Sequence, residues 1–368
     1  MILERLSLIN FKNYDEAQLE YCQKFNCFVG NNGMGKTNLL DAIHYVSFCK
    51  SFFNAVDSQN IKYDLPFFAI QAWINKNGET HEIFCGVKRG AKKQFKHNKK
   101  EYDRLSEHIG LYPLVMISPS DIELIWDGSE VRRKFMDSII SQYDKVYLEK
   151  LIAYNHVLQQ RNALLKQFYE SRSFDNMSLE IWDEQLIIYG EEIIKIRTSF
   201  LQEFIPLFTK NYQFISGTNE NVSLEYESSI KDLSYKTVLL ASLSRDRAVH
   251  YTTAGPHRDD LNFKLMGNSL KKFASQGQQK SYLLALKLAQ FEFIKEKKTT
   301  KPLLLLDDIY DKLDETRFKK LIELVSGDEF GQVFITDTHA ERIHELFEQN
   351  NSQHLIYIVN NGTIVKHG

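Results

Sequence analysis

One stretch of the sequence has the residue types and spacing needed to bind a nucleoside triphosphate. Residues 30–37 read Gly-Asn-Asn-Gly-Met-Gly-Lys-Thr and fit the pattern G-x-x-x-x-G-K-[ST] at every fixed position. Glycines let the backbone curl so that several N–H groups point at one phosphate, and a following helix adds the positive end of its dipole. We therefore predict that Lys36 reaches the β- and γ-phosphates of ATP and that the Thr37 hydroxyl binds Mg²⁺. The predicted nucleotide contacts are Gly30, Asn31, Asn32, Gly33, Met34, Gly35, Lys36, Thr37 and Asn38.

The segments on either side of this loop have the order that a phosphate loop requires. Residues 25–29 form a short apolar run that predicts a buried strand, and residues 38–43 have the spacing of an amphipathic helix. Strand, loop and helix therefore follow one another as expected for a nucleotide site.

A second apolar run supplies the carboxylates that such a site needs. Residues 302–308 read Pro-Leu-Leu-Leu-Leu-Asp-Asp, which predicts a buried strand that ends in two acids. We expect Asp307 to hold Mg²⁺ and Asp308 to position the attacking water, so that Lys36, Asp307 and Asp308 form the catalytic group. Acids also end strands simply because they are solvated there, but their combination with the phosphate loop favours the functional interpretation.

A third segment indicates which class of ATPase this is. Ser275 and Gly277 open a long predicted helix, where they could cap the helix or hold an anion. The Ser-x-Gly-Gln order, one helix before the acidic strand, resembles the signature motif of ABC-type ATPases. That resemblance implies that Ser275, Gly277 and Gln278 contact the nucleotide of a second subunit, with two ATP molecules held in a head-to-tail dimer.

Composition sets broad limits on the protein. The chain has 368 residues, 43% of them hydrophobic and 26% charged, which predicts two domains or one large domain with an insertion. No apolar run approaches the length of a membrane span, and the four cysteines lack zinc spacing, so we expect a cytoplasmic protein with buried reduced thiols and no membrane contact. Because the net charge is only −2, any polyanionic partner must bind a local patch.

Residues 88–100 form one candidate for such a patch, although a solvated hairpin rim explains the run equally well. Its cations are Lys88, Arg89, Lys92, Lys93, Lys96, Lys99 and Lys100.

Hydrophobic periodicity divides the chain into three parts. Apolar runs at 67–73 and 82–87 flank Asn77-Gly78 and predict a hairpin. Helical spacing follows over 131–168 and again from Ile181 to an end near Pro206, with a polar break between them. We predict an α/β fold, an ABC-type P-loop ATPase head with a mixed sheet: residues 1–115 and 241–368 form the ATPase lobe, and 116–240 form an inserted helical subdomain.

With these motifs placed, the chain resembles the RecF family of bacterial ABC-type (SMC-like) ATPases nearly from end to end. The arginine pair Arg132-Arg133 followed by Asp137 and the segment Gly255-Pro256-His257-Arg258 are more specific than the phosphate loop. Further matching segments are residues 10–14 (Asn-Phe-Lys-Asn-Tyr), Gly128-Ser129, Asp259-Asp260-Leu261, Gln278-Gln279-Lys280 and Leu313-Asp314.

The resemblance implies a weak DNA-dependent ATPase of recombinational repair, replication restart and the SOS response. It implies an ATP-dependent homodimer on double-stranded or gapped DNA that helps load the recombinase through RecR, with RecO in the same pathway and slow hydrolysis resetting the dimer. The chain departs from the family pattern at Glu130, where proline is common, and at Asp311-Lys312. His339 could be the residue that senses the γ-phosphate, or a surface histidine at a helix start.

Three other classes of protein share parts of this pattern. A transporter ATPase subunit has the same motifs, but its signature usually lies much closer to the loop than Gly277 lies to Lys36. A chromosome-structural ATPase with long arms needs a far longer chain. A structural clamp with a degenerate site is disfavoured because Lys36, Thr37, Asp307 and Asp308 are all present.

Overall fold

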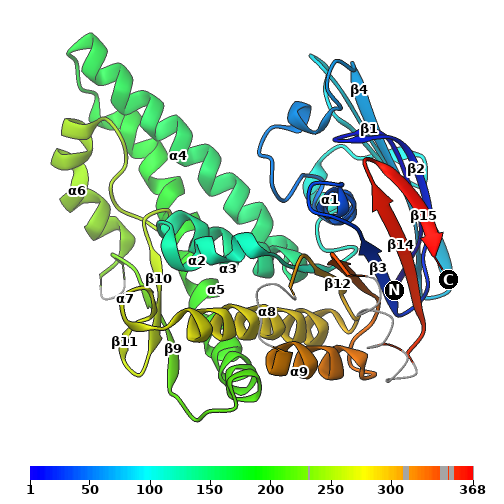
Figure 1. The fold of residues 1–368 in the computed structure, drawn as a ribbon. Helices are drawn as coiled ribbons and strands as arrows, with labels where there is room; N and C mark the ends of the chain where they lie inside the picture. The colour runs from blue at the N-terminus through cyan, green and yellow to red at the C-terminus, as the bar shows by residue number, and fades with distance from the viewer. Residues whose placement is uncertain (231–232, 310–314, 340–346, 348–351, 368) are drawn as a thin grey trace. The chain divides into compact units, whose positions relative to one another are not determined.

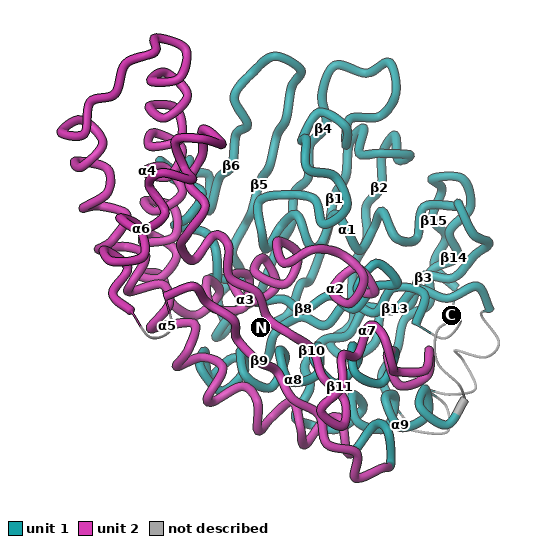
Figure 2. Tube along the Cα trace, turned by 90° about the vertical axis from the view of Figure 1, so that its left-hand side faces the viewer, with its two compact units in different colours: residues 1–121, 214–217, 280–368 teal, residues 122–213, 218–279 magenta. Residues whose placement is uncertain are grey.

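The computed structural model describes residues 1–230, 233–309, 315–339, 347 and 352–367, and they form two compact units. Unit 1 comprises Met1–Asp121, Phe214–Gly217 and Lys280–Gly368, and unit 2 comprises Ile122–Gln213 and Thr218–Gln279 (Figure 2). Each unit has its own sheet structure and is described by itself.

The first sheet of unit 1 is antiparallel and has the order β2-β1-β4-β5-β6-β7, of which Figure 1 labels β1, β2 and β4. Side chains alternate between buried and less buried along β1 and β4, as expected for a sheet with one face against the core. The turn between β4 and β5 has positive φ at Asn77 (56°) and Gly78 (86°), which confirms the predicted hairpin. The strands are β1 (Ile2–Phe11), β2 (Tyr14–Glu20), β4 (Phe67–Lys76), β5 (Glu79–Lys88), β6 (Gln94–His97) and β7 (Lys100–Glu101).

The second sheet of unit 1 is mixed and has the order β15-β14-β3-β13-β12-β8. All its neighbouring strands are parallel except the β14–β15 hairpin at one edge. Every residue of its central strands is buried, which explains why their sequences are mostly apolar and do not alternate, and the predicted strands at 25–29 and 302–308 are confirmed. The strands are β3 (Phe25–Val29), β8 (Leu114–Ile117), β12 (Leu303–Leu306), β13 (Val333–Asp337), β14 (His354–Asn360) and β15 (Thr363–His367).

Helix α1 (Lys36–Phe48) lies between the two sheets, contacting β1, β4 and β5 of the first and β8 and β13 of the second. This position explains why it is buried over most of its length. The other helices of this part of the chain are α8 (Gln276–Lys298), whose first residues belong to unit 2, α9 (Glu315–Ser326), and the short 3₁₀ segments Asp57–Asn60, Leu105–Glu107 and Pro119–Ile122.

Unit 2 combines a long helical hairpin with a three-stranded antiparallel sheet of order β11-β10-β9. The hairpin consists of α4 (Lys145–Ser171) and α5 (Asn176–Ser216), and the last residues of α5 belong to unit 1. The remaining elements are α2 (Glu123–Trp126), α3 (Ser129–Tyr143), β9 (Val222–Glu227), α6 (Tyr235–Val249), β10 (Asp260–Leu265), β11 (Asn268–Ser269) and α7 (Leu270–Phe273).

The prediction that the second helix of the hairpin ends near Pro206 is wrong, because α5 continues to Ser216. Proline removes one helical hydrogen bond, which frees the carbonyl of Gln202. Pro206 and Gln202 are both exposed, so water can solvate that carbonyl. The opposite face remains fully buried through Phe204, Phe208 and Tyr212. Packing of this face therefore outweighs the local preference of proline.

The two compact units divide the chain differently from the predicted limits of 1–115, 116–240 and 241–368. Residues 241–279 belong to unit 2, because β10 pairs with β9 along its whole length. The sequence analysis did not predict this small sheet. As limits of functional domains, the predicted boundaries stay a prediction.

All four cysteines are free and buried, as predicted. Among the described residues, no helix is long and apolar enough to span a membrane.

Candidate nucleotide site

The phosphate loop connects the end of β3 to the start of α1. Gly30 and Gly35 adopt positive φ angles of 154° and 112°, which side chains rarely allow. Space also requires glycine at both positions, because a Cβ on Gly30 would lie 2.3 Å from the Val359 carbonyl oxygen and one on Gly35 would lie 2.4 Å from Nδ2 of Asn13. The loop conformation is therefore fixed by its own backbone and by its neighbours.

Lys36 is the first residue of α1 and is almost fully buried. Its Nζ donates hydrogen bonds to the carbonyl oxygens of Gly30 (2.7 Å) and Asn31 (3.1 Å). The ammonium group thus lies inside the curve of the loop, whose other members Asn32, Gly33 and Met34 follow Asn31 along the chain. A cation held there by neutral carbonyls is placed to exchange them for phosphate oxygens.

The loop and the acidic strand, far apart in sequence, meet at Thr37 and Asp307. The Thr37 hydroxyl donates to Oδ1 of Asp307 at 2.8 Å, and the Thr336 hydroxyl donates to the same oxygen at 2.9 Å. Burial raises the pKa of Asp307 to about 6, while the hydrogen bonds from the two threonines act in the opposite direction. Parallel pairing of β3, β13 and β12 produces this meeting, because their carboxyl ends share one edge of the sheet.

This pair of oxygen donors fits a magnesium ion. Mg²⁺ is usually held by one or two protein oxygens together with phosphates and water, and a buried carboxylate beside a hydroxyl supplies that set. Among the described residues there is no cluster of three or more His, Cys, Asp or Glu side chains that could hold a metal by itself. The protein would therefore hold Mg²⁺ through Thr37 and Asp307 together with the nucleotide.

Asp308 has an unusual backbone conformation, with φ at 43°. Its N–H donates to Oγ1 of Thr336 at 2.8 Å, so Thr336 contacts both acids. Sequence reasoning missed this role of Thr336, although a hydroxyl residue at the end of a neighbouring buried strand could have indicated it. The role of Asp308 as water-positioning residue stays a prediction.

The turn between β1 and β2 also supports the phosphate loop. Nδ2 of Asn13 donates to the Met34 carbonyl at 3.0 Å, and the Tyr14 hydroxyl donates to the Gly35 carbonyl at 3.0 Å. Asn38, a predicted nucleotide contact, donates instead to Oδ1 of Asn13 at 2.7 Å. The sequence analysis noted the segment containing Asn13 only as part of a family motif and assigned it no role.

The predicted signature lies in unit 2, and its serine caps α8. The N–H of Gln278 donates to Oγ of Ser275 at 3.3 Å, and Oε1 of Gln278 accepts from the N–H of Ser275 at 2.9 Å. This reciprocal pair is a capping box at the start of α8. The side-chain amide of Gln278 donates to Glu220 at 2.7 Å. The contact of these residues with a nucleotide in another subunit stays a prediction.

The family-specific segments of unit 2 form one network of ion pairs. Arg132 binds both carboxylate oxygens of Asp260 at 2.7 and 2.9 Å, and Arg133 donates to the Asp259 carbonyl at 2.6 Å. The buried Arg197 connects Asp137, at 2.9 Å, with the Pro256 carbonyl, at 2.9 Å. Two segments separated by more than a hundred residues therefore hold each other in place.

The basic segment 88–100 is less uniform than its sequence suggests. Lys93 is only 16% exposed, pairs with Asp57 at 2.8 Å and donates to the Cys49 carbonyl at 2.7 Å. Lys93 is therefore a structural residue, whereas Lys92 is exposed. A DNA-binding role for this segment is restricted to its exposed cations.

The remaining predicted positions are less informative. His339 is exposed, and its N–H donates to Asp337 at 2.8 Å, an arrangement that agrees with either of its predicted roles. Residues Asp311-Lys312 and Leu313-Asp314 lie outside the described residues.

Comparison with known proteins identifies the family. The model of the RecF/RecN/SMC N terminal domain matches residues 2–364. The DNA replication and repair protein RecF of Flavobacterium johnsoniae is 51% identical over 357 residues, covering 97% of this chain and 99% of that protein. The chain belongs to the RecF family. RecF of Phocaeicola vulgatus is 50% identical, covering 100% of this chain and 98% of that protein.

Solved structures confirm the predicted fold class. The recombination mediator protein RecF-ATP of the RecFOR pathway superposes with a TM-score of 0.90 at 31% identity, over 100% of this chain and 97% of that one. An Smc head bound to the C-terminal winged-helix domain of ScpA has a TM-score of 0.59 at 15% identity, over 100% of this chain and 98% of that one, and shows the fold alone. As a RecF-family protein with this fold, the chain is an ABC-type ATPase of DNA replication and repair.

Proposed function

We propose that the chain binds ATP and DNA and acts in recombinational repair and replication restart as an ATP-gated dimer. The observation that supports this most directly is the contact between Thr37 of the phosphate loop and Asp307 of the acidic strand. This contact joins a residue of the predicted phosphate loop to the predicted Mg²⁺ ligand within unit 1, and a relative in the RecFOR pathway is described as RecF-ATP.

In this mechanism each residue of the site has one role. Lys36 leaves its loop carbonyls to neutralise the β- and γ-phosphates, and the loop N–H groups bind the same oxygens. Thr37 and Asp307 would hold Mg²⁺, which supplies charge neutralisation for phosphoryl transfer. Asp308, fixed by Thr336, orients the water that attacks the γ-phosphate.

The dimer completes the site. Ser275, Gly277 and Gln278, at the start of α8, contact the γ-phosphate of the partner subunit's nucleotide, which the positive end of the helix dipole attracts. ATP thereby closes the dimer on double-stranded or gapped DNA, and slow DNA-dependent hydrolysis reopens it. The closed dimer helps load the recombinase through RecR, with RecO in the same pathway.

Sedimentation measurements test this proposal. We expect analytical ultracentrifugation to show a dimer with Mg²⁺-ATP and duplex DNA, and a smaller species without nucleotide. Lys36→Met removes the main counter-charge of the phosphates and should abolish both ATP binding and dimer formation. If this variant bound ATP and dimerised like the wild type, the nucleotide site would be assigned wrongly.

Two further variants separate hydrolysis from dimer closure. Asp308→Asn should bind ATP but hydrolyse it at least tenfold more slowly, which prolongs the life of the dimer. Ser275→Arg should retain ATP binding but fail to dimerise. The arginine side chain is larger than serine and carries a positive charge, so it disrupts the contact with the partner subunit. Normal turnover of the first variant would place the water-positioning residue elsewhere, and a dimer of the second would contradict the composite site.

A further inference from the structure

A cleft far from the nucleotide site along the chain lies in unit 2, where α4 ends and α6 passes the start of α5. It encloses about 770 Å³. One part of its inner surface is apolar: Leu165 is buried, and Phe168 and Phe174 pack edge to face with ring centroids 5.3 Å apart. Arg172 and Arg247 lie among its lining residues, most of which are otherwise polar. The cleft thus combines an apolar floor, formed by these three side chains, with two guanidinium groups.

These two arginines differ from the buried arginines of the same unit. Arg161 and Arg197 each pair with an aspartate. Among the residues that the structure describes, neither Arg172 nor Arg247 has a carboxylate within ion-pair distance. Glu170 is the one acid among the lining residues, and it forms an ion pair with Lys166 at 3.8 Å. The cleft therefore has unpaired positive charge beside apolar surface.

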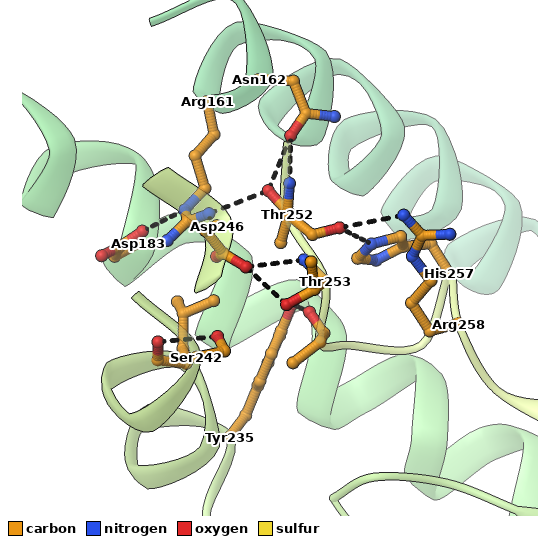
Figure 3. Close-up of polar contacts among 12 residues, drawn as sticks. Arg161, Asn162, Asp183, Tyr235, Ser242, Asp246, Thr252, Thr253, His257 and Arg258 are labelled. Carbon is orange, nitrogen blue, oxygen red and sulfur yellow. Dashed lines mark hydrogen bonds and ion pairs between the residues drawn. The ribbon is translucent and has the colours of Figure 1, made fainter. Parts of the chain in front are cut away.

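The arginine on α6 is held ready for a ligand. The guanidinium of Arg247 lies 3.9 Å above the ring of Phe174, which restricts its conformations before anything binds. One turn before Leu165 on α4, Arg161 joins Asp183 on α5 (2.6 Å) to Asp246 on α6 (2.7 Å), as Figure 3 shows. This buried network fixes the end of α6 and, with it, the residue that follows Asp246.

We infer that this cleft docks a peptide segment of a partner protein in which acidic residues flank an apolar or aromatic side chain. The apolar side chain would occupy the floor, and the carboxylates would pair with Arg172 and Arg247 in the bidentate geometry that guanidinium favours. Leu240 extends the apolar surface, since it lies four and seven residues before Ser244 and Arg247 on α6 and is 60% exposed.

Single-stranded nucleic acid also combines negative charge with apolar rings, but the structure favours a peptide. Bases need open aromatic faces on which to stack. In the cleft, Arg247 covers a face of Phe174, and His250 stacks on Tyr169 with centroids 3.8 Å apart. These contacts occupy one face of each ring, which leaves less aromatic surface for a stacked base than an open platform has and favours the side chain of a peptide.

Fluorescence anisotropy of the full chain tests the inference. The probe is a short fluorescein-labelled peptide with a central Leu-Phe pair flanked on both sides by Glu and Asp. We expect saturable binding, and a loss of affinity of about tenfold or more in Arg172→Gln and in Arg247→Gln, as for a hydrogen-bonded charge pair. The matched control is Arg245→Gln, an exposed arginine of the same helix that does not line the cleft.

A peptide with Gln and Asn in place of its acids should bind about tenfold more weakly, and ATP affinity should be unchanged in all three variants. The inference is overturned if the acidic peptide does not bind the wild type, or if the control variant loses as much affinity as the two cleft variants. It is also overturned if a single-stranded oligonucleotide displaces the peptide and depends on the same two arginines, because the cleft would then be a nucleic-acid site.

Discussion

Burial of Asp307, the predicted Mg²⁺ ligand, lowers the stability of the nucleotide-free protein. The residue is 3% exposed, and burial raises the pKa of its carboxyl to about 6 from an ordinary value of 3.8. A carboxyl with a raised pKa in the folded state resists ionisation there, so folding becomes less favourable once the pH is high enough to ionise it. We therefore predict that Asp307→Asn stabilises the nucleotide-free protein at neutral pH.

The magnitude follows from the pKa. One pKa unit corresponds to about 1.4 kcal/mol, so the rise from 3.8 to about 6 corresponds to about 3 kcal/mol at most. Asparagine keeps one oxygen to accept from Thr37 and Thr336 but accepts less strongly than a carboxylate, which reduces the gain by about 1 kcal/mol. The expected net gain is roughly 1–2 kcal/mol.

The pH dependence gives this prediction its distinctive form. The free-energy cost of ionising the buried Asp307 carboxyl is absent below pH 3.8, grows as the pH rises toward 6 and is complete above it. The stability difference between variant and wild type should therefore grow across that interval and then stay constant. Urea unfolding without nucleotide measures it. With Mg²⁺-ATP, the difference should shrink, because the variant lacks one Mg²⁺ ligand and gains less stability from binding than the wild type does.

Two results would refute the reasoning. If Asp307→Asn were less stable than the wild type at neutral pH without nucleotide, burial of the carboxylate would not be the dominant effect. A stability difference that did not change between pH 4 and pH 7 would show that the carboxyl titrates as in the unfolded chain.

Three further predictions concern residues that shape or surround the site. Gly362→Ala should lower stability by roughly 2 kcal/mol more than Gly78→Ala and should weaken ATP binding, because both positions have positive φ but only at Gly362 would the Cβ meet a backbone oxygen, at 2.6 Å. Lys93→Glu should destabilise the fold by about 1–3 kcal/mol in urea unfolding, whereas Lys92→Glu should leave stability unchanged and, if the segment binds DNA, lower the salt dependence of DNA binding. Arg161→Met should cost about 3–5 kcal/mol of unfolding free energy, because it leaves two acids without their buried cation.

Each of these predictions has a result that contradicts it. Equal ATP affinities of the two glycine variants would show that the C-terminal hairpin, which contains Gly362, does not influence the phosphate loop. Normal stability of Lys93→Glu would show that Lys93 is not a structural residue, and it would again be a candidate for contact with DNA. A small effect of Arg161→Met would mean that Asp183 and Asp246 are neutralised without the arginine.

The parts of the fold that sequence could predict are those whose local pattern has one physical explanation. Apolar runs such as 303–306 and 333–337 are strands because a parallel sheet covered on both faces requires them. Asn77-Gly78 between two such runs predicts a hairpin because both residues tolerate positive φ. The phosphate loop belongs to the same class, since its glycines and lysine are required by local geometry.

The parts that sequence could not predict depend on contacts between distant segments. The strand Val222–Glu227 is short and half polar, and it becomes a strand by pairing with residues 260–265. Pro206 would end an isolated helix, but long-range packing keeps α5 intact. The hydrogen bond from Asn13 to Met34 joins two loops with no pattern in common. The secondary-structure propensity of a local sequence does not describe such contacts.

The family-specific residues and the chemical residues of this chain have different physical roles. The phosphate loop is a motif shared by many nucleotide-binding proteins, and its residues are the ones predicted to contact the nucleotide. The segments that most specifically indicated the RecF family, around Arg132 and Pro256, are instead bound to each other through Asp260 and Arg197. Removing one member of such a network leaves a buried charge without its partner, which costs free energy. The identity of each residue in the network is therefore constrained by the others. A sequence that must keep a buried ion network intact therefore retains a more distinctive pattern than one that must only bind a phosphate.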